Sequence, residues 1–229
     1  MASADAPILA LDDARRSFDD GRIVGLAGVT LRFQRGELVA LCGASGSGKS
    51  TLINLISGLD APTAGTVTFD GRFGLTRAQW TELRASRIGL VFQDFNLIPT
   101  LTAAENVETA MFGRHSVAER RRIALARLAE VGIAHCATRL PPQLSGGERR
   151  RVAIARGLAN QPEVLLADEP TSNLDTASGA AVIDLLLSLH AKGGVTMIIV
   201  SHDETLIARC PRRIRLSDGK VVRDERDAP

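Results

Sequence analysis

Hydrophobic and polar positions along the chain follow two periods, one typical of strands and the other of helices. Val29–Phe33 alternates apolar with polar residues, which predicts a strand with one exposed face. Mostly apolar runs predict buried strands at Glu37–Cys42, Ile88–Gln93, Val164–Ala167 and Val195–Val200. Between the last two lies Thr176–Ala191, whose pattern is helical. Strands that alternate with helices in this way favour a parallel α/β sheet.

The middle of the chain has a different pattern, which is mostly helical from about residue 94 to residue 162. Apolar residues recur at near-helical spacing over Ala118–Val131, and Gly132 follows where that helix should end. We therefore expect one domain, in which residues 94–162 form a helical subdomain. Residues 1–93 and 163–229 would form the core around it.

Turn residues add a helix and a hairpin to this outline. Ser50–Ser57 predicts a helix that Gly58 ends. Near the end of the chain, Asp218-Gly219 separates Arg213–Leu216 from Lys220–Val222, which predicts an antiparallel hairpin.

Composition and charge narrow the class of protein. The chain has 229 residues, 45% of them hydrophobic and 24% charged, so we expect an ordinary globular fold. The net charge is +2 with acids and bases interspersed, which is too weak to argue for nucleic-acid binding. The arginine runs at 120–122 and 149–151 are expected to lie on solvated helix faces.

Cysteines and apolar stretches point to the cytoplasm. Cys42, Cys136 and Cys210 are few, odd in number and far apart, which fits reduced thiols and neither disulfides nor a zinc site. Residues 1–7 have neither a basic nor an apolar stretch, so we do not expect a signal peptide. Apolar runs fall far short of the ~18–20 residues that span a bilayer, so any membrane role is expected to come through a partner.

Gly43–Ser50 has the pattern G-x-x-x-x-G-K-S, placed between a predicted buried strand and a predicted helix. Glycines let the backbone curl around phosphate oxygens, and the helix adds its positive end. Lys49 would reach the β- and γ-phosphates, and the Ser50 hydroxyl would bind Mg²⁺. A chance glycine turn is the alternative, and the flanking strand and helix argue against it.

Asp168 and Glu169 follow the strand Val164–Ala167, at the sheet edge where ligands bind in open α/β sheets. Asp168 there can hold Mg²⁺. Strand alternation would point Glu169 away, but at the end of the strand it can turn toward a γ-phosphate and an attacking water. The alternative for Glu169 is an exposed residue in the turn before Pro170.

Ser145-Gly146-Gly147-Glu148 has the spacing of a capping box, with Ser145 as the N-cap of a helix that runs to about Ala159. Capping does not explain the two glycines, each of which weakens a helix by about 1 kcal/mol. Such a pair leaves room for a close approach to the backbone, for which an anion is the obvious candidate.

Gln93 and His202 also follow predicted strands at their carboxyl ends. A lone histidine is usually structural, but this position makes His202 a candidate contact of a γ-phosphate. The neutral amide of Gln93 can contact both Mg²⁺ and water.

Together these residues resemble the ATP-binding cassette (ABC) ATPases over nearly the whole chain. The family's ordered motifs match the Walker A loop Gly43–Ser50, the Q-loop Gln93, the signature Leu144–Glu148, the Walker B segment Val164–Glu169, the D-loop Ser172–Asp175 and the H-loop His202. The resemblance implies a P-loop NTPase fold. Its core would be a RecA-like, mostly parallel sheet, with a small antiparallel β subdomain and a helical signature subdomain.

The resemblance also implies roles for individual residues. Phe18 falls where the family often has an aromatic residue that stacks on adenine. Contacts to ATP would come from Phe18, Gly43, Ala44, Ser45, Gly46, Ser47, Gly48, Lys49, Ser50, Thr51, Ser145, Gly146, Gly147 and Asp175. Mg²⁺ would be held by Ser50, Gln93 and Asp168, and catalysis would rest on Glu169, His202, Gln93 and Lys49.

The partners implied by the resemblance are a second cassette and membrane permease subunits, and no nucleic acid. Two cassettes would enclose two ATP molecules, each between Gly43–Ser50 of one chain and Ser145–Gly147 of the other. Asp175 would reach across that interface, although an N-cap role for Thr176–Ala191 is an equally good local interpretation. The chain would then be cytoplasmic and peripheral on the inner face of the membrane. Four apolar residues would either offer a groove to a cytoplasmic helix of the permease or form subdomain core; these are Phe95, Leu97, Ile98 and Phe112.

Within the family, the residues of these motifs resemble those of the bacterial lipoprotein-release, macrolide-export and cell-division cassettes. Ser172 departs from the glycine common there, and Arg149-Arg150 departs from a usual Gln or Lys. The expected function is that of the ATPase subunit of a transporter that exports lipoprotein, lipid or drug. One alternative is a cassette that drives transmembrane signalling without transport. The other is a cassette that acts on nucleic acid, which usually needs tandem cassettes or a long coiled coil.

Overall fold

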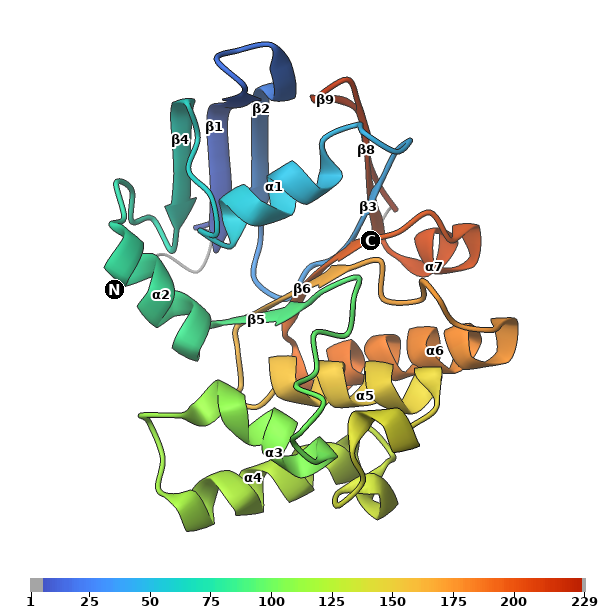
Figure 1. Ribbon diagram of the computed structural model, residues 1–229. Coiled ribbons are helices and arrows are strands. Elements are labelled where there is room, and N and C mark those ends of the chain that lie inside the picture. The colour runs from blue at the N-terminus through green and yellow to red at the C-terminus, as the bar shows by residue number, and fades with distance from the viewer. Residues whose placement is uncertain (1–5, 228–229) are drawn as a thin grey trace. The chain divides into compact units, whose positions relative to one another are not determined.

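The computed structural model describes residues 6–227 and divides into two compact units (Figure 1). The first unit comprises the chain up to Leu83 and again from Gly194, and the second is Arg84–Gly193. Helix α2, Arg77–Ser86, runs across the first boundary. The predicted boundaries of the helical subdomain, after residues 93 and 162, stay a prediction.

In the first unit, an antiparallel sheet has the order β2-β1-β4 (Figure 1). Its strands are β1, Leu9–Phe18; β2, Ile23–Phe33; and β4, Ala64–Phe69. Sequence patterning predicted the end of β2 and missed β1. The reason is a bulge near Asp13, whose φ is 43°, because this bulge shifts the register and breaks the alternation of apolar residues.

A second sheet carries the parallel strands of this unit, in the order β7-β3-β8-β9. Strand β3, Leu38–Cys42, pairs in parallel with β7, Thr196–Val200, and with β8, Arg212–Ser217. Strand β9, Lys220–Arg226, pairs with β8 in the predicted antiparallel hairpin. Every residue of β3 and β7 is buried, as their apolar runs predicted.

Two helices of the first unit follow strands of this sheet. Helix α1, Lys49–Ile56, begins after the glycine loop that β3 leads into, and Gly58 follows its end with a φ of 65°. Helix α7, Glu204–Arg209, follows β7 and was not predicted. At six residues it is too short for a helical period to stand out.

The second unit contains a pair of parallel strands and most of the helices. Strand β5, Ile88–Val91, pairs with β6, Val164–Asp168. The helices are α3, Ala103–Glu108; α4, Val117–Glu130; α5, Gly146–Gly157; and α6, Thr176–Gly193. Short 3₁₀ turns lie at Thr109–Met111, Ala134–Cys136 and Pro141–Gln143. Helical structure over residues 94–162 was predicted, and Gly132 follows α4 with a φ of 77°.

Helix α5 packs directly on β5 through two glycines. A Cβ atom added to Gly89 would lie 2.2 Å from the Gly157 carbonyl oxygen, so only glycine permits this approach. The side chains of α5 that face the interior include Val152, Ile154 and also Arg150, whose exposed fraction is 0%. The prediction that the arginine run 149–151 lies on a solvated face is therefore wrong for Arg150. None of the described helices is both long and apolar enough to span a membrane.

Candidate functional site

The glycine loop Gly43–Ser50 leaves the buried end of β3 in a conformation that needs glycine. The φ angles of Gly43, Gly46 and Gly48 are 147°, 78° and 103°, in the region that L side chains rarely adopt. A Cβ on Gly48 would lie 2.4 Å from the Gly25 carbonyl oxygen, and one on Gly43 would lie 2.3 Å from that of Leu216. The loop is thus held closely between β2 and β8.

Polar groups of this loop point to an anionic ligand. The Lys49 ammonium donates to the carbonyl oxygens of Gly43 and Ala44, at 2.8 and 2.9 Å, and so lies over the loop. The Ser47 hydroxyl is buried and has no hydrogen-bond partner among the described residues. Helix α1 begins at Lys49, and no side chain caps it. Backbone amides at a helix start, a lysine and an unpaired hydroxyl are the donors that a phosphate chain requires.

Phe18 and Thr51 meet beside this loop, although they are far apart in the sequence. A Cβ on Gly25 would approach Phe18 Cε2 at 2.8 Å and Thr51 Oγ1 at 3.0 Å, so both side chains border Gly25. The Phe18 ring is 37% exposed, and the Arg16 guanidinium lies 4.7 Å from its centroid. Arg16 is itself paired with Asp60 at 2.8 Å. The open part of the ring could stack on a flat base.

His202 leaves the same edge of the sheet as the glycine loop. Leu41 in β3 is paired with Val200 in β7, and the Ser201 amide donates to the Leu41 carbonyl at 3.1 Å. His202 is exposed at the end of β7. Asp203 then caps α7, since its Oδ1 accepts the amide of Thr205 at 2.9 Å.

In the second unit, Gln93 and the acids Asp168 and Glu169 also come to one edge. Val91 in β5 is paired with Ala167 in β6, so the residues that follow these two strands emerge side by side. Glu169 has a φ of 47°, a left-handed conformation that ends the alternation of the strand. Its carbonyl accepts the amide and the hydroxyl of Ser172, at 3.1 and 2.7 Å.

The signature segment forms the predicted capping box. Ser145 Oγ accepts the Glu148 amide at 3.2 Å, and Glu148 Oε2 accepts the Ser145 amide at 2.7 Å. Glu148 Oε1 accepts the Cys136 thiol at 3.1 Å and lies 3.6 Å from Arg139. The Ser145 amide, then the Cys136 thiol, lower the pKa of Glu148 to about 2. Burial raises the pKa of Cys136, which keeps that residue a thiol that donates.

Gly146 and Gly147 lie in helical conformation at the start of α5. Gly146 faces the segment Ser172–Asp175 of its own chain, and Gly147 faces the first turn of α6. A Cβ on Gly146 would lie 3.2 Å from Leu174 Cδ2, and one on Gly147 would lie 3.3 Å from Ser178 Oγ. Packing within the chain thus explains part of the need for small residues here. Asp175 Oδ1 accepts the Ser178 amide at 2.9 Å, so the local interpretation of Asp175 as an N-cap is confirmed.

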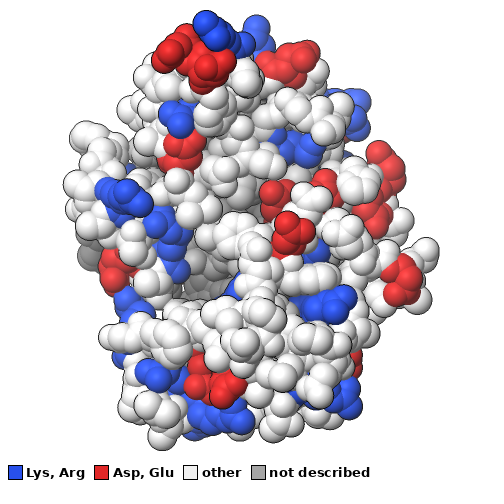
Figure 2. Space-filling model, viewed as in Figure 1, with Lys and Arg blue, Asp and Glu red and all other residues white. Residues whose placement is uncertain are grey.

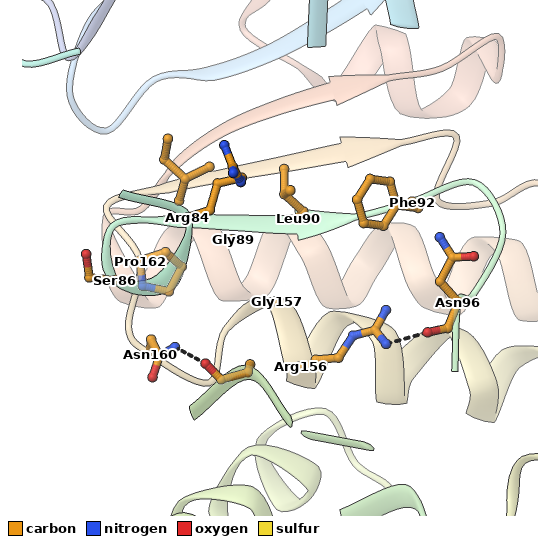
Figure 3. Close-up of a pocket in the computed structure, with 12 residues that line it drawn as sticks. Arg84, Ser86, Gly89, Leu90, Phe92, Asn96, Arg156, Gly157, Asn160 and Pro162 are labelled. Carbon is orange, nitrogen blue, oxygen red and sulfur yellow. Dashed lines mark hydrogen bonds between the residues drawn. The ribbon is translucent and has the colours of Figure 1, made fainter. Parts of the chain in front are cut away.

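A cavity of about 280 Å³ lies next to the Q-loop (Figure 3). It is lined on one side by Leu90 of β5 and by Phe92 just after that strand. On the other side lie Arg156 of α5 and Asn160, which follows that helix. Arg156 donates to the carbonyl of Asn96, and burial lowers the pKa of the Arg156 guanidinium. Nothing in the sequence singled out Arg156 or Asn160, because neither belongs to a motif.

The four apolar residues named as a groove or as core differ in exposure. Ile98 and Phe112 are 44% and 59% exposed, which excludes them from a core. Phe95 and Leu97 are half-buried. Arg120 covers one face of Phe112, with 4.7 Å between the guanidinium and the ring centroid.

Comparison with known proteins gives the family. The ABC transporter family model matches residues 26–172, more than half of the chain. The lipoprotein-releasing system ATP-binding protein LolD of Myxococcus xanthus is 47% identical over 203 residues, 87% of this chain and 91% of LolD. The macrolide export ATP-binding/permease protein MacB of Burkholderia pseudomallei is 47% identical over 223 residues, 95% of this chain and 34% of MacB. The chain therefore spans about a third of the length of the MacB proteins that it matches.

A solved structure shares the fold. The ATP-binding cassette MJ0796, solved as a dimer in a post-hydrolysis state bound to ADP and Pi, matches with a TM-score of 0.88 and 41% identity, over 96% of this chain and 99% of that one. This match confirms the predicted fold class. The relatives named for lipoprotein release and macrolide export confirm the predicted likeness to that subgroup. The chain belongs to the ABC transporter family.

Proposed function

We propose that this chain is the ATPase subunit of an export-type ABC transporter and works with separate membrane subunits. The observation that carries the proposal is the loop Gly43–Ser50. Lys49 lies over this loop, and the buried Ser47 hydroxyl has no hydrogen-bond partner in the part of the chain that the structure describes. Both are donors placed for a triphosphate. Relatives named for ATP binding in lipoprotein release and macrolide export support the same function.

We assign the residue roles as follows. The loop amides and Lys49 bind the phosphates, and Phe18 stacks on the adenine. Glu169 orients and polarises the attacking water, and His202 contacts the γ-phosphate. The oxygen donors of Ser50, Gln93 and Asp168 fit Mg²⁺, which supplies charge to offset the phosphates when bound.

We further propose that two copies of the chain share each ATP. In this arrangement Ser145–Gly147 of one copy faces the phosphates bound by the loop of the other. The half-open start of α5 supports this, since Ser145 caps only some of its amides. The dimeric state of MJ0796 with ADP and Pi supports it also.

The cavity beside the Q-loop is our candidate dock for a membrane subunit. Its apolar wall of Leu90 and Phe92, with the exposed Ile98 nearby in sequence, suits the apolar face of a short helix. Because MacB is named an ATP-binding and permease protein and is about three times as long, its remaining length would hold the permease.

Acidic and basic side chains are mixed over the face drawn in Figure 2.

The test is Glu169→Gln, with Arg122→Gln as the matched control on the exposed face of α4. Glu169→Gln should reduce ATP turnover at least a hundredfold, keep ATP binding within threefold, and accumulate dimer with ATP in light scattering. Arg122→Gln should behave as wild type. Turnover by Glu169→Gln at the wild-type rate would exclude Glu169 as the catalytic carboxylate.

A further inference from the structure

Arg150 is a buried cation that joins three segments of the second unit. It lies in the second turn of α5 and has no exposed surface. Its Nη1 donates to the Phe92 carbonyl at 2.6 Å. Its Nη2 donates to the Gln93 carbonyl at 2.7 Å and lies 3.3 Å from the carbonyl and 3.4 Å from the hydroxyl of Ser172.

The surroundings of Arg150 indicate that its role is to make these hydrogen bonds and not to fill the interior. Burial lowers the pKa of the guanidinium to about 10, against the opposite effect of Asp94, so Arg150 stays charged at neutral pH. The Phe95 ring covers it, with 4.7 Å from the guanidinium to the ring centroid. An apolar side chain of similar volume usually stabilises an interior equally well or better. A buried arginine bound to carbonyls is therefore better explained by the geometry that it imposes.

The segments that Arg150 joins carry two of the proposed catalytic residues. On one side it binds the backbone of Gln93 itself. On the other it binds Ser172, whose hydroxyl donates to the Glu169 carbonyl at 2.7 Å. One guanidinium thus fixes the backbone at Gln93 and the turn that holds Glu169 in its left-handed conformation.

We propose that Arg150 is the positioning residue that holds Gln93 and Glu169 in register and couples both to the signature end of α5. This inference rests on the proposed ATPase function. Helix α5 is continuous from Gly146 to Gly157, so Arg150 moves with its first turn. Engagement of Ser145–Gly147 by a nucleotide is thereby transmitted to both catalytic segments. The two departures from the family pattern, Arg150 and Ser172, are partners in this contact.

The kinetic test compares Arg150→Gln and Arg150→Lys with Arg122→Gln. Both Arg150 variants should lower kcat at least tenfold while calorimetric affinity for MgADP stays within twofold. Lysine should not rescue, because a single ammonium cannot reproduce the planar fork that reaches Phe92, Gln93 and Ser172 together. Full activity of either variant would overturn the proposal.

A double mutant separates positioning from general stability. In a Gln93→Ala background, Arg150→Gln should lower kcat by a smaller factor than in the wild-type background, because one of the two catalytic groups that Arg150 positions is already absent. If the tenfold loss persisted in full, Arg150 would not act through Gln93, and the proposal would fail.

Amide hydrogen exchange gives a readout that needs no ATPase activity. In Arg150→Gln, peptides over residues 92–96 and 169–175 should exchange at least tenfold faster, whereas Arg122→Gln should match wild type. Should Arg150→Gln not fold, Ser172→Ala should speed exchange over 169–175 alone. Unchanged exchange in the variants would overturn the inference. If the wild-type chain hydrolysed no ATP while the variants still showed these changes, the proposed function would fail and the positioning role of Arg150 would stand.

Discussion

Two glycine-rich helix starts in this chain look alike in sequence and differ in structure. Glycines of the phosphate loop before α1 have positive φ angles, and no side chain caps that helix. Glycines of the signature lie within α5 in ordinary helical conformation, after a complete capping box. Glycine is therefore needed before α1 because the backbone has positive φ angles, and at the start of α5 because neighbouring atoms leave little room for a side chain. The uncapped start is built to bind phosphate by itself, and the capped start leaves only part of its amides for a ligand.

The largest expected effect tests this difference directly. Gly48→Ala must place a Cβ 2.4 Å from the Gly25 oxygen at a φ of 103°, whereas Gly147→Ala keeps helical φ and meets Ser178 Oγ at 3.3 Å. We expect Gly48→Ala to lose MgADP affinity at least a hundredfold. Gly147→Ala should retain it within twofold in the isolated chain. Both are measured by calorimetry, and equal losses would remove the distinction.

The start of α5, at Ser145–Gly147, should affect ATP turnover only when a second copy of the chain is present. Ser145→Arg should bind ATP as wild type does, yet lower ATP turnover at least tenfold, because it places a bulky side chain where the partner's nucleotide would lie. Mixed with a Lys49→Ala variant, it should recover part of the activity, since one composite site is intact in the hybrid. Mixtures that stay inactive would contradict the sharing of ATP between chains.

The smallest expected effect is on the free energy of unfolding, and it comes from the capping box. This effect should depend on pH. Because the pKa of Glu148 is lowered to about 2 in the folded chain, its charge stabilises the fold above the unfolded pKa and ceases to do so as pH falls through 2. Glu148→Gln keeps an acceptor and should cost about 1 kcal/mol at pH 7. Urea denaturation at pH 7 and pH 3.5 should show a smaller difference at the lower pH. A cost that is independent of pH would mean that the carboxylate charge is not what stabilises this helix.

Residues in motifs could be placed from the sequence because local rules govern them. The capping box, the strand before the glycine loop and the turn at Asp218-Gly219 each depend on a few consecutive residues, and each was predicted. Strand β1 was missed because a bulge at Asp13 interrupts its pattern. The prediction that Arg150 is solvated was wrong because it relied on the charge of the side chain and not on its position along the helix. It lies on the same stripe of α5 as Ala153, Ile154 and Gly157, and that helical spacing was the available signal.

The sequence by itself determined the family, the α/β alternation and the residues that carry the motifs, since each follows from residue type and short-range spacing. Only the tertiary structure decided which distant residues meet: Phe18 with Thr51, Cys136 with Glu148, and Arg150 with Gln93 and Ser172. Such contacts depend on how strands pair and helices pack over long separations in the chain. A guanidinium buried against carbonyls has the same letter in the sequence as one in solvent, and its neighbours alone give it a function.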